Sequence, residues 1–107
     1  MREKQIHAAV IDHWKWFGLP DTLVATIPNE KSFGQPGLTP GILDLLCIGP
    51  LGVGLLELKT DKGKLSDAQS DFVDLCVKRD VLHAVTYGRS EPIRVLEEWQ
   101  IVRRTNY

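Results

Sequence analysis

Apolar residues near the start of the chain recur at the spacing of one helical face. Polar residues stand between them, which is the pattern of an amphipathic helix packed on a core. The pattern predicts a helix over residues 2 to 17, ended by Gly18 and Pro20. Its inward face is expected to consist of Ile6, Ala9, Val10, Trp14 and Phe17.

The next segments have the apolar, β-branched composition of strands. A short strand is expected over Leu23 to Ile27. Two longer apolar runs, Ile42 to Ile48 and Val53 to Thr60, are separated by Gly49-Pro50-Leu51-Gly52, the pattern of a hairpin with a four-residue loop. Residues 29 to 41 are rich in glycine, proline and small polar residues and predict a long loop, of the kind that often lines a site.

A second helix is predicted over Asp67 to Lys78. Ser66 and Gln69 stand at the two positions of a capping box, in which each side chain pairs with the backbone of the other residue. The apolar face of this helix is expected to consist of Phe72, Val73, Cys76 and Val77.

The remaining segments predict a strand over Val81 to Tyr87 and a helix from Glu91 to about Ile101. Ser90 is the expected cap of that helix, and Pro92 suits its first turn. Its inward residues are expected to be Ile93, Leu96 and Trp99. The element order is therefore αβββαβα, an α/β fold.

The composition is that of a folded domain. The 107 residues are 43% hydrophobic and 25% charged, and a chain of this length buries enough surface to form one domain, residues 1 to 107. The net charge of −1 gives no overall attraction for nucleic acid, so DNA or RNA binding would need a local cluster. Lys59, Lys62 and Lys64 form one candidate cluster.

The cysteines and the lack of long apolar runs indicate a reducing, soluble compartment. Cys47 and Cys76 lie in apolar segments without the spacing of a zinc site, so both are expected to be buried free thiols. No signal peptide, lipidation motif or apolar run of about 18 residues is present. We therefore expect an intracellular, cytoplasmic protein with no membrane partner.

Three charged residues, Asp44, Glu57 and Lys59, interrupt the two runs of the hairpin. A buried carboxylate is costly unless it is paired or binds a metal. In a hairpin symmetric about Pro50-Leu51, Asp44 would lie opposite Glu57, and Lys59 would follow on the same face. Two facing carboxylates repel each other unless a cation lies between them, and a register slip of one residue would separate them.

Two acids followed by a lysine suit the hydrolysis of a phosphodiester. Asp44 and Glu57 would hold Mg²⁺ or Mn²⁺ through hard oxygen ligands, and the backbone carbonyl of Leu58 would complete the inner shell. Lys59 would orient or deprotonate the attacking water, or stabilise the developing negative charge. In the alternative interpretation, Asp44 caps a turn while Glu57 and Lys59 extend from an edge strand into solvent.

At these residues the chain resembles the PD-(D/E)XK nuclease superfamily, whose signature is an Asp, a variable gap and then Glu-X-Lys. Over residues 3 to 87 it is similar to the VRR-NUC family of that superfamily. The matching segments are Gly41-Ile42-Leu43-Asp44-Leu45-Leu46, Glu57-Leu58-Lys59, Gly63-Lys64-Leu65-Ser66 and Gln69. The resemblance implies a restriction-endonuclease-like αβββαβ core with a mixed central sheet flanked by helices, followed here by a C-terminal helix.

The resemblance also implies two further site residues. A metal-site glutamate is expected on the first helix, where Glu3 matches, with His7 one turn later. Gln69 matches a helix glutamine near the site and joins Asp44, Glu57 and Lys59 as an expected catalytic residue. Both have an ordinary alternative, because the helix dipole favours a first-turn Glu and the capping box alone accounts for Gln69.

The implied activity is hydrolysis of DNA with Mg²⁺ or Mn²⁺, on branched, junction or flapped substrates in replication, repair or recombination. The family includes small proteins of phages and bacteria, so a bacterial or phage-infected cell is the expected setting. A homodimer would let two active sites cut two strands. Trp16 is a better interface candidate than Trp14 and Trp99, which are expected in the core.

Two alternatives remain open. A non-catalytic nucleic-acid-binding or assembly module would keep the fold, although phosphate binding gains nothing from two facing acids. A nuclease acting on RNA would use the same site, because a site built for the phosphodiester does not report the sugar.

Overall fold

The computed structural model describes residues 1–28 and 40–105, so most of the predicted loop over residues 29 to 41 lies outside the described residues. The observed element order is the predicted αβββαβα. The elements are α1 (Glu3–Phe17), β1 (Leu23–Thr26), β2 (Leu45–Gly49), β3 (Gly52–Lys59), α2 (Asp67–Lys78), β4 (Leu82–Tyr87) and α3 (Ser90–Glu98).

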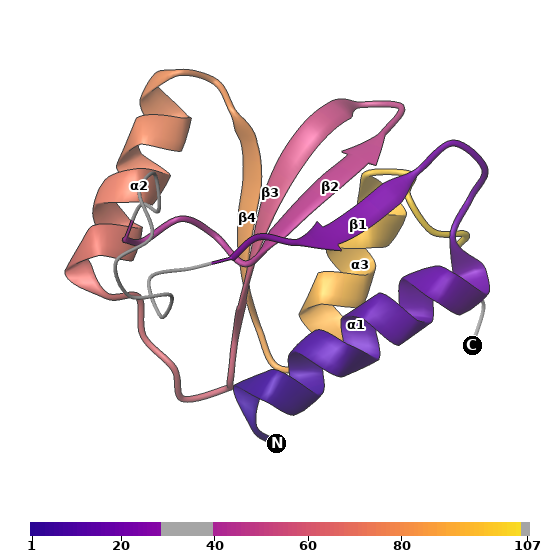
Figure 1. Ribbon diagram of the computed structural model, residues 1–107, viewed down its shortest axis with the longest axis horizontal. Helices are drawn as coiled ribbons and strands as arrows, with labels where there is room; N and C mark the ends of the chain where they lie inside the picture. The colour runs from indigo at the N-terminus through magenta and orange to yellow at the C-terminus, as the bar shows by residue number, and fades with distance from the viewer. Residues whose placement is uncertain (29–39, 106–107) are drawn as a thin grey trace.

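The four strands form one mixed sheet in the order β1-β2-β3-β4. The pairs β1–β2 and β2–β3 are antiparallel, and β3–β4 is parallel, with α2 as the crossover between them. Helices α1 and α3 lie together on one side of the sheet, and α2 lies beside β4 on the other (Figure 1). The predicted α/β fold with a mixed sheet is confirmed. None of the helices in the described ranges is long and apolar enough to cross a membrane.

The hairpin turn is tighter than predicted. Gly49 pairs with Gly52, so only Pro50 and Leu51 remain between paired residues, instead of a four-residue loop. Gly52 has a φ of 106°, a conformation open to glycine, which allows this short turn. The symmetric register is nevertheless the expected one, because both versions have the same centre.

Strand β2 begins at Leu45, three residues later than predicted, because Asp44 leaves the ladder. The Asp44 carbonyl accepts a hydrogen bond from the N–H of Ile27 at 2.8 Å, while its carboxylate Oδ2 accepts one from the N–H of Leu58 at 2.9 Å. The Asp44 carboxylate thus accepts the hydrogen bond of the Leu58 N–H in β3, where regular strand pairing would supply a backbone carbonyl. The site residue Asp44 therefore lies at the end of the strand and not within it.

The last helix also differs from the prediction. It starts at Ser90 with Arg89 at the cap position, and no side chain caps it. It ends at Glu98, short of the expected Ile101, because Gln100 has a φ of 59° and turns the chain. Ile101 and Val102 then enter the core in an extended segment, where they are 2% and 1% exposed.

Helix α2 has the predicted bounds and the predicted capping box. The Gln69 N–H donates to Ser66 Oγ at 3.1 Å, and the Ser66 N–H donates to Gln69 Oε1 at 2.9 Å. The predicted apolar face is wrong at Val77, which is 64% exposed. Helix α2 contacts the sheet chiefly at β4, and only a narrow face of the helix is covered. Cys76 lies on that face and is buried.

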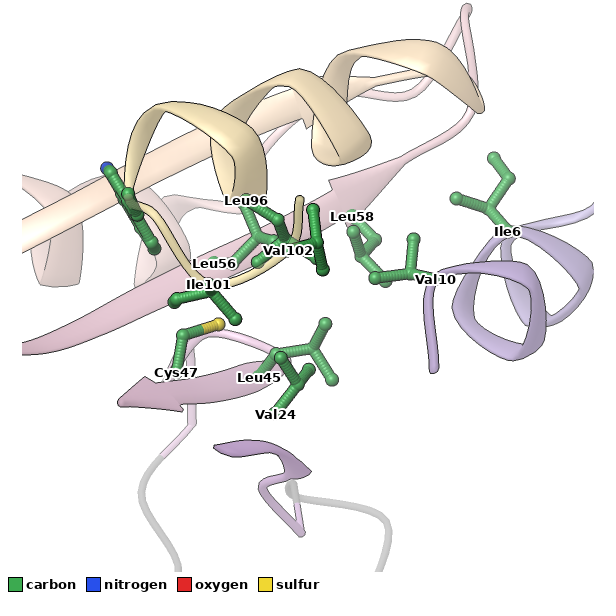
Figure 2. Packing of buried hydrophobic residues seen from close by; sticks show 11 residues of the cluster. Ile6, Val10, Val24, Leu45, Cys47, Leu56, Leu58, Leu96, Ile101 and Val102 are labelled. Atoms are coloured by element: carbon green, nitrogen blue, oxygen red, sulfur yellow. The ribbon is translucent and has the colours of Figure 1, made fainter. Parts of the chain in front are cut away.

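The core lies between the sheet and the two helices α1 and α3 (Figure 2). Leu56 and Leu58 of β3 are fully buried there. Because side chains alternate along a strand, Glu57 between them projects to the opposite face, toward α2. The labelled core residues are Ile6, Val10, Val24, Leu45, Cys47, Leu56, Leu58, Leu96, Ile101 and Val102.

The tryptophans follow the expected division. Trp99 is 7% exposed, and Trp14 is half-buried with its indole N–H donating to Thr22 Oγ1 at 3.0 Å. Trp16 is 80% exposed on α1.

Gly41 ties the segment that carries Asp44 to the first turn of α2. Its φ is 86°, and a Cβ added to it would fall on the backbone of Ala68. We expect Gly41→Ala to destabilise the protein by more than about 1 kcal/mol, through backbone strain and this clash. Urea unfolding followed by circular dichroism measures the loss.

Gly52→Ala is the matched control, because Gly52 also has a positive φ but an added Cβ would meet nothing within 4 Å. The stability lost in Gly52→Ala measures only the cost of placing alanine at a positive φ. Equal losses for Gly41→Ala and Gly52→Ala would contradict the close approach of Gly41 to α2.

Candidate active site

Three carboxylates from distant parts of the chain meet at one end of the sheet. Glu3 comes from the first turn of α1, Asp44 from the residue before β2, and Glu57 from near the C-terminal end of β3. Each offers a carboxylate oxygen, and these oxygens lie within 4.8 Å of one another. The structure thus brings together the three side chains expected to hold a metal.

Backbone N–H groups hold both the Asp44 and the Glu57 carboxylate. The Asp44 N–H donates to Glu57 Oε1 at 3.2 Å, and the Leu58 N–H donates to Asp44 Oδ2 at 2.9 Å. The expected opposition of the two acids is present, and the register slip that would separate them is excluded by the pairing of Leu45 with Leu56. Each carboxylate keeps a second oxygen that is free of these two contacts.

Glu57 is completely buried, and two polar groups meet at its second oxygen. Lys59 Nζ lies 3.4 Å from Oε2, and Gln69 Nε2 donates to the same oxygen at 2.8 Å. The Glu57 backbone is anchored as well, because the hydroxyl of Thr86 on β4 donates to its carbonyl oxygen at 2.8 Å. The edge-strand alternative for Glu57 is therefore wrong, since β3 is an inner strand of the sheet.

Gln69 serves the helix cap and the site at the same time. Its Oε1 accepts from the Ser66 N–H, while its Nε2 donates to Glu57. The two interpretations of this residue are compatible, because the amide has one acceptor end and one donor end. The cap fixes the orientation of the amide, and the donor end then points at the carboxylate.

The electrostatics of Glu57 are those of a crowded anionic site. Burial, followed by the charge of Asp44, raises the pKa of Glu57 from 4.5 to about 7, with a smaller contribution from Glu3. The ammonium of Lys59 lowers that pKa but does not compensate for the rest. Three carboxylates against one ammonium form a hard oxygen donor set with excess negative charge, which is compatible with a divalent metal ion.

Leu58 contacts the site through its backbone. Its N–H holds the Asp44 carboxylate, and its side chain is buried in the core. The use of its carbonyl oxygen as a metal ligand stays a prediction.

The three lysines of the predicted basic cluster lie in different environments. Lys59 is 8% exposed and directed at Glu57, so it belongs to the site. Lys62 and Lys64 are exposed on the loop between β3 and α2.

Sequence reasoning missed Thr86 and Thr26. Thr86 is 2% exposed in a buried strand, and a polar residue at such a position was the only signal of its role. The Thr26 hydroxyl forms a hydrogen bond with His7 Nε2 at 2.9 Å, which joins β1 to α1 close to Glu3. No local pattern indicates that contact, because 19 residues separate the two partners.

No protein-family model matches the sequence, and the comparison with curated proteins likewise gives no match. Among solved structures, the chain is similar to a VRR_NUC domain with a TM-score of 0.67 and 19% sequence identity. The similarity covers 91% of this chain and 96% of that one. The resemblance expected from the motifs is thus confirmed in three dimensions, and this chain has the fold of a VRR_NUC domain.

Proposed function

We propose that this protein is a metal-dependent nuclease that hydrolyses phosphodiester bonds in DNA. One observation carries the proposal: Glu57, fully buried, lies among Asp44, Glu3, Lys59 and Gln69 in a VRR_NUC fold. A purely structural role would place a hydrophobic residue there, because burying several like charges is unfavourable. A site that binds a cation and a phosphodiester needs these charges.

Glu3, Asp44 and Glu57 would hold Mg²⁺ or Mn²⁺. When bound, such an ion supplies a more acidic water and neutralises charge on the phosphoryl oxygens. The hydrogen bonds from Leu58 and Gln69 hold two of the carboxylates in place before the ion arrives. We keep the Leu58 carbonyl as a further proposed ligand.

Lys59 is the proposed catalytic cation. Its Nζ is 3.4 Å from Glu57 Oε2 and on the same face of β3, so it is held beside the carboxylates. From this position it orients the attacking water or stabilises the negative charge that develops on the phosphoryl group. Gln69 is a proposed positioning residue, because it acts on the reaction through Glu57.

The proposed substrate is DNA of branched, junction or flap structure, handled in replication, repair or recombination. The net charge of −1 favours selection by local shape over binding to any duplex. The described residues form one sheet with three helices, which offers little surface for reading a base sequence. The buried free thiols of Cys47 and Cys76 support a reducing compartment, as expected in the cytoplasm.

The test uses labelled four-way junction, flap, duplex and single-stranded DNA, and the flap made of RNA, each with Mg²⁺, Mn²⁺ or chelator. We expect cleavage of DNA that requires the metal and is fastest on a branched substrate. Binding without cleavage in every condition would favour the non-catalytic module instead. Faster cleavage of the RNA flap would redirect the proposal to an RNA nuclease.

We also propose a homodimer, supported by an apolar row on the sheet face opposite the core. Leu23, Ile48 and Val53 pair across three adjacent strands and are 39%, 36% and 54% exposed. Such a row is unfavourable in water and is typical of an interface. Sedimentation equilibrium is expected to detect a dimer that Val53→Asp converts to monomer.

Leu75→Asp is the control for the dimer, because Leu75 is similarly apolar and 52% exposed but lies on α2. It should leave the dimer intact. A wild-type monomer with and without DNA would overturn the dimer proposal without affecting the proposed chemistry.

A further inference from the structure

We infer that the hollow between α1 and β1, beside the acid cluster, binds an unpaired nucleotide of the strand that is cut. The inference rests on the proposed function and names a feature of its substrate. The hollow has a volume of about 600 Å³ and shares Glu3 and Asp44 with the acid cluster. Whatever fills it therefore adjoins the phosphodiester that reacts. Its other lining residues are Lys4, His7, Ala8, Thr26 and Ile27.

The lining combines the groups that a nucleotide requires. Ala8 and Ile27 supply an apolar wall for a sugar or base, and His7 supplies an aromatic ring on which a base can stack. The hydrogen bond to Thr26 restrains the His7 ring, so binding a base costs little further side-chain entropy. Lys4 adds a cation for the adjoining phosphate at the rim.

The size of the hollow favours an unpaired nucleotide over a paired one. Its volume lies in the range of small-molecule sites, and it is an open hollow that one nucleotide can enter, whereas a duplex is too wide. A base within a duplex has both faces stacked and its edge paired, so it cannot reach the wall without leaving the helix. Branch points, flaps and frayed ends already present such free nucleotides. The hollow thereby gives a physical reason for selecting these structures.

The test fills the hollow without touching the acids. Ala8 is exposed on α1, so Ala8→Trp is compatible with the fold and occupies the space, whereas Ala8→Ser leaves it open. We expect Ala8→Trp to lower kcat/KM on flap DNA by roughly tenfold or more, the loss of one stacked base. Lys4→Ala should weaken cleavage in the same direction. Lys15→Ala, at the far end of α1, is its matched control and should change cleavage by less than about twofold.

A second measurement identifies the occupant. Removing the base next to the cleaved bond from the flap substrate should lower the kcat/KM of the wild type about as much as Ala8→Trp lowers it with intact DNA. Combining the variant with the abasic substrate should lower kcat/KM little further. The same comparison of two proteins and two substrates is repeated with the Lys59→Ala substitution added to both proteins. The Kd for flap DNA is then measured, so the result does not depend on cleavage. Cleavage and binding by Ala8→Trp equal to wild type, or losses that multiply independently, would overturn the inference. Lack of cleavage by every protein, wild type included, would instead contradict the proposed function.

Discussion

Glu57→Gln is expected to reduce DNA cleavage on the order of a thousandfold, because it removes the charge on which the whole site converges. Glu57 contacts the backbone of Asp44 and the side chains of Lys59 and Gln69. Glutamine keeps the size of the side chain, so the buried position remains filled. Single-turnover cleavage of the preferred substrate, with protein in excess, measures the loss in the chemical step.

Asp44→Asn and Lys59→Ala are expected to reduce cleavage to a similar extent, since each removes one member of the same group of interacting charged residues. The three effects should therefore combine far less than additively. Asp12→Asn is the control for loss of an acidic charge, because Asp12 is exposed on α1 and away from the acid cluster. Residual cleavage by Glu57→Gln equal to wild type would contradict the assignment of this site.

Gln69→Glu separates the cap from the site. A glutamate at this position retains the capping box of α2, because its carboxylate can still accept from the Ser66 N–H. When ionised it cannot donate to Glu57, and it places a further negative charge beside that carboxylate. We expect slower cleavage with a larger dependence on metal concentration, while α2 remains formed by circular dichroism. An unchanged metal dependence would leave Gln69 with the helix cap alone.

Without metal, Glu57→Gln is expected to be more stable than wild type at pH 8. The pKa of Glu57 is raised to about 7 by burial and by Asp44, so folding favours the neutral carboxyl. Its stabilising contribution is complete below about pH 4.5 and is lost as the pH rises through about 7. At pH 8 the wild type therefore holds an unfavourable buried anion, which glutamine lacks. We expect the variant to melt roughly 5 °C or more above wild type in chelator.

With a divalent metal bound, the wild type should become more stable than Glu57→Gln. A divalent ion that binds only the folded wild type at a hundredfold excess over its Kd stabilises it by about 3 kcal/mol. The variant, with one ligand charge removed, should gain much less. Thermal unfolding at pH 5 and pH 8, in chelator and with Mn²⁺, measures both effects. A wild type that is equally stable with and without Mn²⁺ at pH 8 would contradict the metal centre.

The features that sequence reasoning placed correctly are set by contacts between near neighbours. The start of α2 follows from the Ser66–Gln69 capping box. The opposition of Asp44 and Glu57 follows from a short hairpin and from alternation along its strands. Periodicity and turn chemistry act over a few residues, so they are readable in one dimension.

Two of the errors arose where distant parts of the chain decide the end of an element. Nothing local indicates that β2 starts only at Leu45, because the Asp44 carboxylate takes the hydrogen bond of Leu58, a residue of another strand. Likewise α3 ends at Glu98 because Ile101 and Val102 are buried in the core by leaving the helix.

The sequence by itself determined the order of the elements, the hairpin register and the opposition of Asp44 and Glu57. The resemblance suggested Glu3 and Gln69 but left an ordinary alternative for each. Only the tertiary structure decided that the Glu3 carboxylate lies beside those of Asp44 and Glu57, that Gln69 contacts Glu57 while it also caps α2, and that a hollow opens beside them. The reason is physical: each of these depends on how α1 and α2 are placed against the sheet. That placement is set by burial of apolar surface summed over the whole core, which no short segment encodes.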